Sequence, residues 1–125
     1  MNAFWGADGG YAPVAEVSFY MPNVDICLLE YDTPRAGDFQ PLRHAANNKK
    51  LLLGIVSTKD PTLEASDTLK RRIDDASKYV DVKQLGICPQ CGFSTNVFGT
   101  EFTIDDERRK IERMVDVANE VWGTA

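Results

Sequence analysis

The feature that most constrains the fold is a set of three short, nearly continuous apolar runs. They lie at residues 24–30, 51–57 and 85–88. A strand covered on one face alternates apolar and polar residues, whereas a strand covered on both faces reads as an unbroken apolar run. The sequence therefore predicts three buried parallel strands, joined by crossover connections.

Amphipathic segments lie before and between these runs. Residues 11–21 predict a helix that ends at Pro22, because proline cannot continue a helix. Residues 66–80 predict a second helix, whose start Ser66 or Asp67 can cap. The apolar positions of these segments are Val14, Val17, Phe19 and Met21 in the first and Leu69, Ile73, Ala76 and Val80 in the second. Both segments thus alternate with the predicted strands.

The last predicted helix carries the clearest boundary signals. Thr103 with Asp106 resembles a capping box, with Asp in place of the usual Glu, and Gly123 occupies the position of a C-cap glycine. The apolar residues at helical spacing between them are Ile111, Met114, Val115, Ala118, Val121 and Trp122. The order helix, strand, short helix, strand, helix, strand, helix predicts an α/β fold with right-handed crossovers.

Length and charge exclude several classes of protein. The 125 residues fit one domain, and 14 Lys and Arg against 19 Asp and Glu give a net charge of −5. This acidic balance argues against binding to a nucleic-acid backbone, and the apolar runs are too short to cross a membrane. The first residues lack the pattern of a signal peptide, so we expect a cytoplasmic protein. Three cysteines are too few for a disulfide framework and predict free thiols.

In parallel sheets the chemistry lies beyond the carboxyl ends of the strands, here residues 30–32, 57–59 and 88–91. Glu30 follows the first apolar run directly, where a carboxylate is costly to desolvate unless it is paired or bound to a cation. It is either a surface residue at a strand end, or a metal ligand or catalytic carboxylate. The only histidine, His44, lies in a polar stretch away from any strand end, so we expect it at the surface.

Cys88 and Cys91 form a CxxC pair at the end of the third run. A structural zinc site needs a second pair of ligands, and no second CxxC or HxxxH occurs in the sequence. A thioredoxin-like pair would open a helix, whereas Gly92 indicates a turn. Cys91 is therefore the better candidate ligand, and Cys88 and Cys27 are predicted to pack in the core.

Three stretches carry a resemblance to a known family: 28–39 (LLEYDTPRAGDF), 53–59 (LGIVSTK) and 89–93 (PQCGF). They resemble the C-terminal part of the cobalamin-independent methionine synthases, in their shorter archaeal-type and bacterial forms. The closing residues 120–123 (EVWG) also resemble the end of that family, and the similarity runs from Gly9 onward. The resemblance implies that residues 1–125 form a single partial domain, the C-terminal portion of a TIM (β/α)8 barrel.

The resemblance also implies a chemistry. The family holds a catalytic zinc with a His, a Cys, a Glu and a second Cys, and the last two match Glu30 and Cys91, while Cys88 falls on a non-ligand position. The zinc binds homocysteine as a thiolate, which attacks the methyl group of a methylated folate polyglutamate in methionine biosynthesis. The residues that we expect to line the substrate site are Arg35, Ser57 and Lys59.

The sequence departs from the family in one respect. The first His and Cys ligands come from a His-x-Cys motif just before the segment that matches 9–11, and residues 1–8 contain neither residue type. We therefore expect a fragment, or one part of a split enzyme completed by an N-terminal chain or by another copy. The alternatives are a non-catalytic remnant that associates through its unpaired sheet edges, or a related zinc-dependent alkyltransferase acting on a thiol such as coenzyme M.

Overall fold

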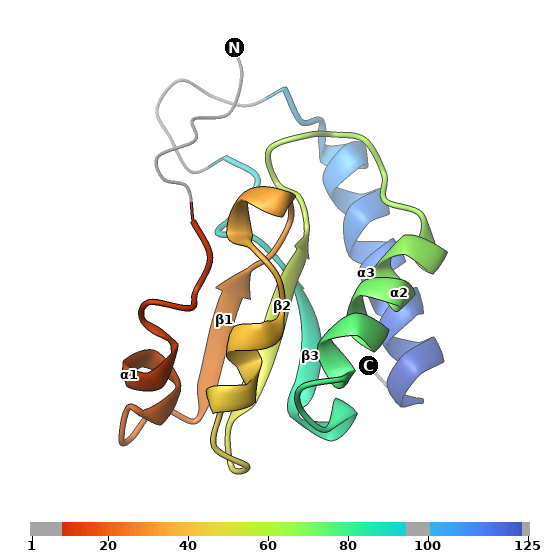
Figure 1. Cartoon of the computed structure of the whole chain (residues 1–125). Helices are drawn as coiled ribbons and strands as arrows, with labels where there is room; N and C mark the ends of the chain where they lie inside the picture. Colours follow the sequence, from red (N-terminus) through yellow and green to blue (C-terminus); the bar gives the residue numbers. More distant parts are fainter. Residues whose placement is uncertain (1–8, 95–100, 124–125) are drawn as a thin grey trace.

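The computed structural model describes residues 9–94 and 101–123, and consists of a parallel three-stranded sheet flanked by helices (Figure 1). The strands, in the order β1-β2-β3, are β1 (Ile26–Glu30), β2 (Lys50–Val56) and β3 (Leu85–Pro89). The helices are α1 (Ala15–Tyr20), α2 (Ser66–Ser77) and α3 (Ile104–Trp122), and the 3-10 turns are η1 (Pro34–Ala36), η2 (Gln40–His44) and η3 (Val82–Gln84). The predicted alternation of parallel strands with helices is confirmed.

The central strand β2 sets the register of the whole sheet. Its Gly54 pairs with Glu30 of β1 on one side and with Cys88 of β3 on the other. Paired residues of neighbouring strands point to the same face, so Glu30 and Cys88 lie on the face that also carries Leu28 and Leu52. The opposite face carries the fully buried Leu51 and Leu53, which join the hydrophobic core.

Only one face of β1 is covered by the described residues. Leu29 is buried in the core, whereas Ile26 is 52% exposed and Leu28 is 69% exposed. The prediction that β1 is covered on both faces is therefore wrong for residues 9–94 and 101–123. Within this apolar run, Ile26 and Leu28 face outward on the side of the sheet away from the core, while Leu29 faces inward.

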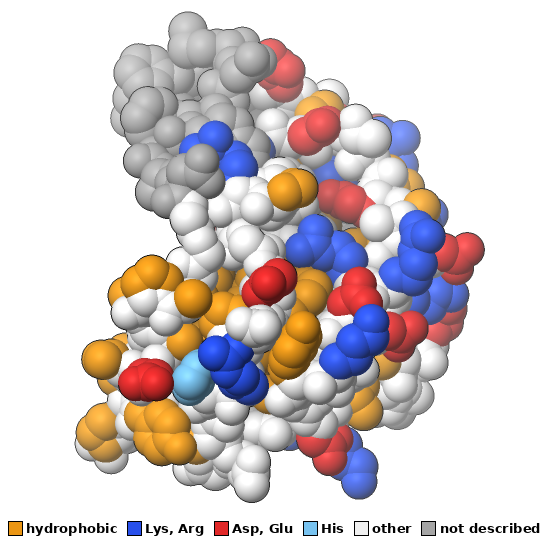
Figure 2. All heavy atoms as spheres, viewed as in Figure 1, with side chains coloured by type: hydrophobic (Ala, Val, Ile, Leu, Met, Phe, Trp, Pro, Cys, Tyr) orange, Lys and Arg blue, Asp and Glu red, His pale blue; other side chains and the backbone are white. Residues whose placement is uncertain are grey.

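Helix α1 is shorter than predicted, and only Phe19 of its predicted apolar positions is buried. It buries Ala15 and Phe19, one turn apart, and Phe19 packs with Tyr11 at a ring-centroid distance of 6.4 Å. The other apolar side chains at this end of the chain are exposed, namely Val14, Val17, Tyr20 and Met21. Figure 2 shows hydrophobic side chains gathered at the lower left, where Figure 1 places α1. A six-residue helix has room for one buried pair, so most of the predicted apolar positions stay outside.

Helix α2 buries Leu69, Ile73 and Ala76, as predicted. Its N-cap is Ala65, which makes no side-chain capping bond, so the prediction of a cap at Ser66 or Asp67 is wrong. The helix begins one residue earlier than a cap at Ser66 requires. Asp67 instead lies in the first turn, where its negative charge is favourable next to the helix N-terminus.

Helix α3 confirms both predicted boundaries. The Thr103 hydroxyl accepts a hydrogen bond from the Asp106 amide at 3.1 Å, the Asp106 carboxylate accepts one from the Thr103 amide at 2.9 Å, and Gly123 ends the helix with φ +85°. Its buried face differs from the predicted stripe, because Lys110 and Val117 are buried whereas Ile111 and Val115 are exposed. Within the described ranges, no helix is long and apolar enough to cross a membrane.

Candidate functional site

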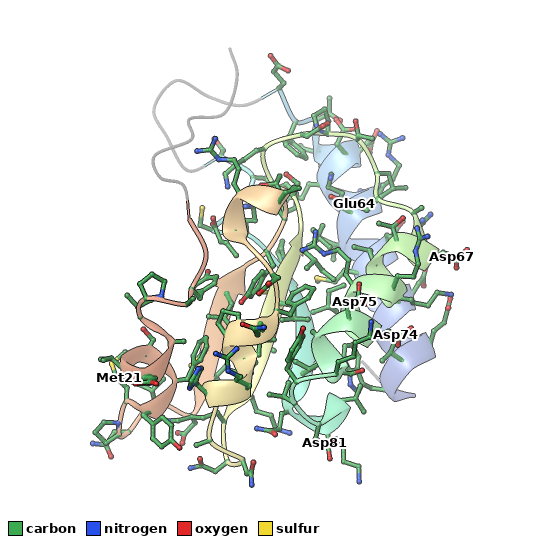
Figure 3. The ribbon with its side chains drawn as sticks, viewed as in Figure 1. Met21, Glu64, Asp67, Asp74, Asp75 and Asp81 are labelled. Carbon is green, nitrogen blue, oxygen red and sulfur yellow. The ribbon has the colours of Figure 1, made fainter. Side chains whose placement is uncertain are left out.

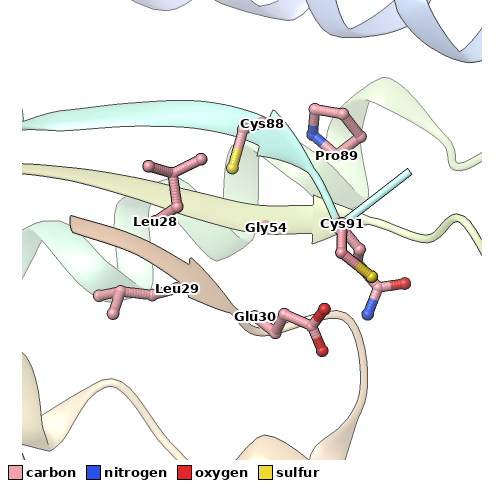
Figure 4. Close-up of a pocket in the computed structure, with 8 residues that line it drawn as sticks. Leu28, Leu29, Glu30, Gly54, Cys88, Pro89 and Cys91 are labelled. Atoms are coloured by element: carbon pink, nitrogen blue, oxygen red, sulfur yellow. The ribbon is translucent and has the colours of Figure 1, made fainter. Parts of the chain in front are cut away.

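An open pocket of about 240 Å³ lies at the carboxyl ends of the three strands (Figure 4). Residues from β1, β2, β3 and the turn after β3 line it: Leu28, Leu29, Glu30, Gly54, Cys88, Pro89, Gln90 and Cys91. This is the edge of a parallel sheet at which α/β folds place their binding and catalytic groups.

Two of the sequence-predicted site residues, Glu30 and Cys91, meet in this pocket although they are far apart in the sequence. Figure 4 shows both side chains reaching toward the same end of it. The end of β1 is held in place by Tyr11, whose hydroxyl accepts a hydrogen bond from the Glu30 amide at 2.8 Å. Both side chains are exposed, so a ligand entering the pocket can reach the carboxylate and the thiol.

Glycine at position 54 keeps the floor of the pocket open. A Cβ atom there would lie 2.9 Å from the Leu29 carbonyl oxygen and 3.4 Å from Glu30 Cα, which is too close to backbone that cannot move freely. Any side chain on Gly54 would also enter the space between Glu30 and Cys88, its partners on the two outer strands.

The two cysteines of the CxxC pair have different environments. Cys88 is buried, and this burial, with the nearby Glu30 charge as a second cause, raises the pKa of its thiol to about 11. Cys91 is exposed on the turn at the mouth of the pocket. The burial of Cys88 agrees with its expected packing role. Cys27, which was also expected in the core, is half-buried and packs against the hydrophobic core. All three cysteines are free thiols.

Gln90 is a site residue that the sequence did not reveal. Its side-chain oxygen accepts hydrogen bonds from the Thr58 amide at 3.0 Å and the Ser57 hydroxyl at 3.4 Å, so it ties the Cys91 turn to the loop after β2. The backbone donor fixes which end of the amide is oxygen. The buried Nε2 of Gln90 has no hydrogen-bond partner among the described residues.

The predicted substrate-lining residues are distributed unevenly. Lys59 Nζ lies 3.4 Å from Glu30 Oε2 and 3.9 Å from Asp32 Oδ2, and Ser57 reaches the site through Gln90. Arg35 is exposed on η1 and is not one of the residues that line the pocket. The structure thus brings Ser57 and Lys59 to the edge of the site and leaves Arg35 outside its lining.

A buried ion pair supports the loop after β2. Lys110 of α3 is 1% exposed and donates to both Glu64 carboxylate oxygens at 3.0 Å and to the Thr62 carbonyl at 2.6 Å. Glu64 in turn accepts a hydrogen bond from the Ser57 amide at 2.8 Å. Figure 3 shows Glu64 on the loop beside α3. Because Lys110 occupies an inward position of an otherwise amphipathic helix, apolar periodicity gave no sign of this pair.

The donor set fits part of a zinc site. A carboxylate oxygen and a cysteine sulfur are both zinc ligands, and zinc usually takes four. Over the part of the chain that the structure describes, no three His, Cys, Asp or Glu side chains group closely enough to hold a metal ion. His44 is half-buried beside Glu16, with Nδ1 3.8 Å from its carboxylate, and does not line the pocket. Glu30 and Cys91 are therefore two candidate ligands, and a complete zinc site would need others beside them.

Residues 17–120 match the family described as "Cobalamin-independent synthase, Catalytic domain". Two proteins of Bacillus subtilis (strain 168), the uncharacterized YxjG and YxjH, are similar to this chain. They are 43% and 39% identical to it over 119 residues, which is 94% of this chain and 32% of each of them. The chain thus spans about a third of the length of these relatives.

Two solved structures share the fold. One is a B12-independent methionine synthase from Shewanella sp. W3-18-1 in complex with selenomethionine, with a TM-score of 0.73 and 23% identity over 90% of this chain and 30% of that one. The other, from Listeria monocytogenes, was assigned as a vitamin-B12-independent methionine synthase, with a TM-score of 0.63 and 30% identity over 92% of this chain and 33% of that one. The three strands and their helices therefore correspond to a piece of a TIM-barrel-like enzyme domain.

Proposed function

The chain belongs to the cobalamin-independent synthase catalytic-domain family, and on this premise we propose that it contributes Glu30 and Cys91 to a thiol-activating zinc site. The observation that carries the proposal is that these two side chains line one pocket at the carboxyl ends of parallel strands. The residues are of the types that zinc binds, and both are accessible.

The reaction that we propose is the methylation of homocysteine by a methylated folate polyglutamate, which yields methionine. Zinc, when bound, lowers the pKa of a coordinated thiol so that the thiolate is present at neutral pH. Glu30 and Cys91 would hold it on this chain, and the family resemblance supplies a His and a Cys as the remaining ligands. A related thiol such as coenzyme M would use the same two residues.

The other residues of the site have proposed supporting roles. Gln90 fixes the Cys91 turn against Ser57 and Thr58, and Gly54 keeps the space beside Glu30 free. Ser57, Lys59 and Arg35 are proposed to contact substrate, and the exposed guanidinium of Arg35 suits a carboxylate of a folate polyglutamate.

The remaining ligands and strands would come from residues outside this sequence. The uncovered face of β1, with Ile26 and Leu28 exposed, is the surface against which further barrel residues would pack. These residues would lie in the same polypeptide, in a complementing chain or in another copy. This arrangement accords with relatives of which the chain covers about a third.

Elemental analysis of zinc tests the proposal. The chain is purified with a polypeptide that carries the rest of the barrel, and we expect about one zinc ion per complex, the number that one four-ligand site holds. Glu30→Ala and Cys91→Ala should lose zinc, whereas Cys27→Ala, which changes a cysteine that does not line the pocket, should retain it. A folded complex without zinc contradicts the proposal.

A second candidate function is that of an association module without catalysis. The exposed apolar face of β1 favours it, since unpaired edges and uncovered apolar faces promote association. Size-exclusion chromatography with light scattering distinguishes the two. A defined homo-oligomer that holds no zinc supports this candidate, and a stable monomer contradicts it.

A further inference from the structure

Lys59 lies between two carboxylates at the end of the sheet. Its ammonium nitrogen is 3.4 Å from Glu30 Oε2 and 3.9 Å from Asp32 Oδ2. The Lys59 side chain is 17% exposed and that of Asp32 is 4% exposed, whereas that of Glu30 is 47% exposed. The mostly buried ammonium of Lys59 thus lies near two carboxylates, that of Glu30 in the pocket and the buried one of Asp32.

The two carboxylates are not equally satisfied. Glu30 accepts a hydrogen bond from Lys59, whereas the buried Asp32 Oδ2 has no hydrogen-bond partner within residues 9–94 and 101–123. A buried carboxylate oxygen without a hydrogen bond is costly, so it offers a favourable position to any donor that can move to it. The Lys59 ammonium is already close to it, and a small rotation of its flexible side chain brings the two together.

A metal ion at Glu30 and the Lys59 ammonium repel each other, because both cations would lie close to the same carboxylate. We propose that Lys59 holds Glu30 in the pocket while no metal is bound, and shifts to Asp32 when a divalent cation takes Glu30. The inference rests on the proposed role of Glu30 as a metal ligand. Lys59 is then a positioning residue, and Asp32 is the acceptor that makes its displacement favourable.

The proposal predicts effects of opposite sign for two substitutions. Lys59→Met removes the competing cation, so the affinity for a divalent cation should rise, by about tenfold for a charge this close. Asp32→Asn removes the negative charge that receives the ammonium, so the affinity should fall, again by about tenfold. A merely structural role for Lys59 would instead lower the affinity in both variants.

The test is titration with Cd²⁺ alone of the chain in complex with the polypeptide that completes the barrel. Binding is followed by the ultraviolet absorbance of the cadmium–thiolate bond. The wild type, K59M, D32N and the double variant K59M/D32N form a double-mutant cycle. With Lys59 absent, the Asp32→Asn change should lower the affinity much less, because only the direct attraction between Asp32 and the metal ion is then lost. The matched controls are Lys78→Met and Asp75→Asn, which alter an exposed pair at the C-terminal end of α2, 2.6 Å apart, and should leave the affinity at its wild-type value.

The outcomes test separately the role of Lys59 and the metal site itself. If both single variants weaken binding, or if their effects simply add, the role assigned to Lys59 is wrong while the metal site stands. If wild type gives no saturable Cd²⁺ signal, or Glu30→Gln leaves it unchanged, the proposed metal site itself is wrong. Far-ultraviolet circular dichroism monitors folding, and if K59M does not fold, the double variant replaces it. The double variant should bind Cd²⁺ more tightly than wild type, and equal or weaker binding overturns the proposal.

Discussion

Glu30 and Cys88 lie opposite each other on the two outer strands, with only Gly54 of β2 between them. The absence of a side chain on Gly54 is therefore what leaves the pocket floor open between a carboxylate and a thiol. The carboxylate also affects its neighbour, because its charge adds to burial in raising the pKa of Cys88. This relationship places residues of three strands in the lining of one pocket.

Substitution of Gly54 by alanine should destabilise the sheet around this pocket. The new Cβ would lie 2.9 Å from the Leu29 carbonyl oxygen, so strand β1 has to shift, at a cost of about 1–3 kcal/mol in the free energy of unfolding. Urea denaturation measures the loss. Gly86→Ala is the matched control, because its Cβ would meet only the end of the flexible Leu52 side chain, and its cost should be smaller. Equal losses of stability in the two variants would show that the close approach of Gly54 to the Leu29 carbonyl oxygen imposes no particular constraint.

The thiols should differ in reactivity, and the difference should depend on pH. Only the thiolate reacts with iodoacetamide, and with a pKa of about 11 the Cys88 thiol is about 0.1% ionised at pH 8. We expect rapid alkylation of the exposed Cys91 at pH 8 and protection of Cys88, with labelling of Cys88 rising only as the pH approaches 11. Peptide mapping by mass spectrometry measures both rates. Comparable labelling of the two residues in the native protein at pH 8 would contradict this assignment.

Removing one partner of the buried Lys110–Glu64 ion pair should destabilise the fold strongly. Lys110→Met leaves the Glu64 carboxylate without its cation and removes support from the loop that carries Ser57, so we expect a loss of about 3 kcal/mol. The loss in the free energy of unfolding is obtained from the midpoint and slope of the denaturation curve. Lys78→Met breaks an exposed pair and should leave the midpoint unchanged. A wild-type midpoint in Lys110→Met would rule out this supporting role.

Much of the fold could be predicted because local signals and packing agree. The Thr103–Asp106 capping box and Gly123 fix α3 by backbone hydrogen bonds that the sequence specifies directly. The nearly continuous apolar runs identify the three strands because such runs favour buried parallel strands, although Ile26 and Leu28 of β1 are exposed among the described residues. Glu30 and Cys91 could be predicted as candidate site residues because the carboxyl ends of parallel strands lie at the same edge of a sheet.

The residues that were missed depend on contacts that no local pattern encodes. Lys110 is buried only because Glu64 and the Thr62 carbonyl meet it from another element. Gln90 joins the site through the amide of Thr58 on a different strand end. In α1, Phe19 packs against Tyr11, whereas the other positions that its periodicity favoured, Val14, Val17 and Met21, are exposed.

The central claim is that Cys91, and not the CxxC pair, supplies the thiolate ligand of a zinc site with Glu30. The most direct test is the zinc affinity of the folded protein together with the polypeptide that completes the barrel, measured for Cys91→Ala and Cys88→Ala side by side. The account predicts that Cys91→Ala abolishes zinc binding and that Cys88→Ala leaves the affinity nearly unchanged. Equal losses in the two variants would contradict it and would assign the metal to a CxxC site instead.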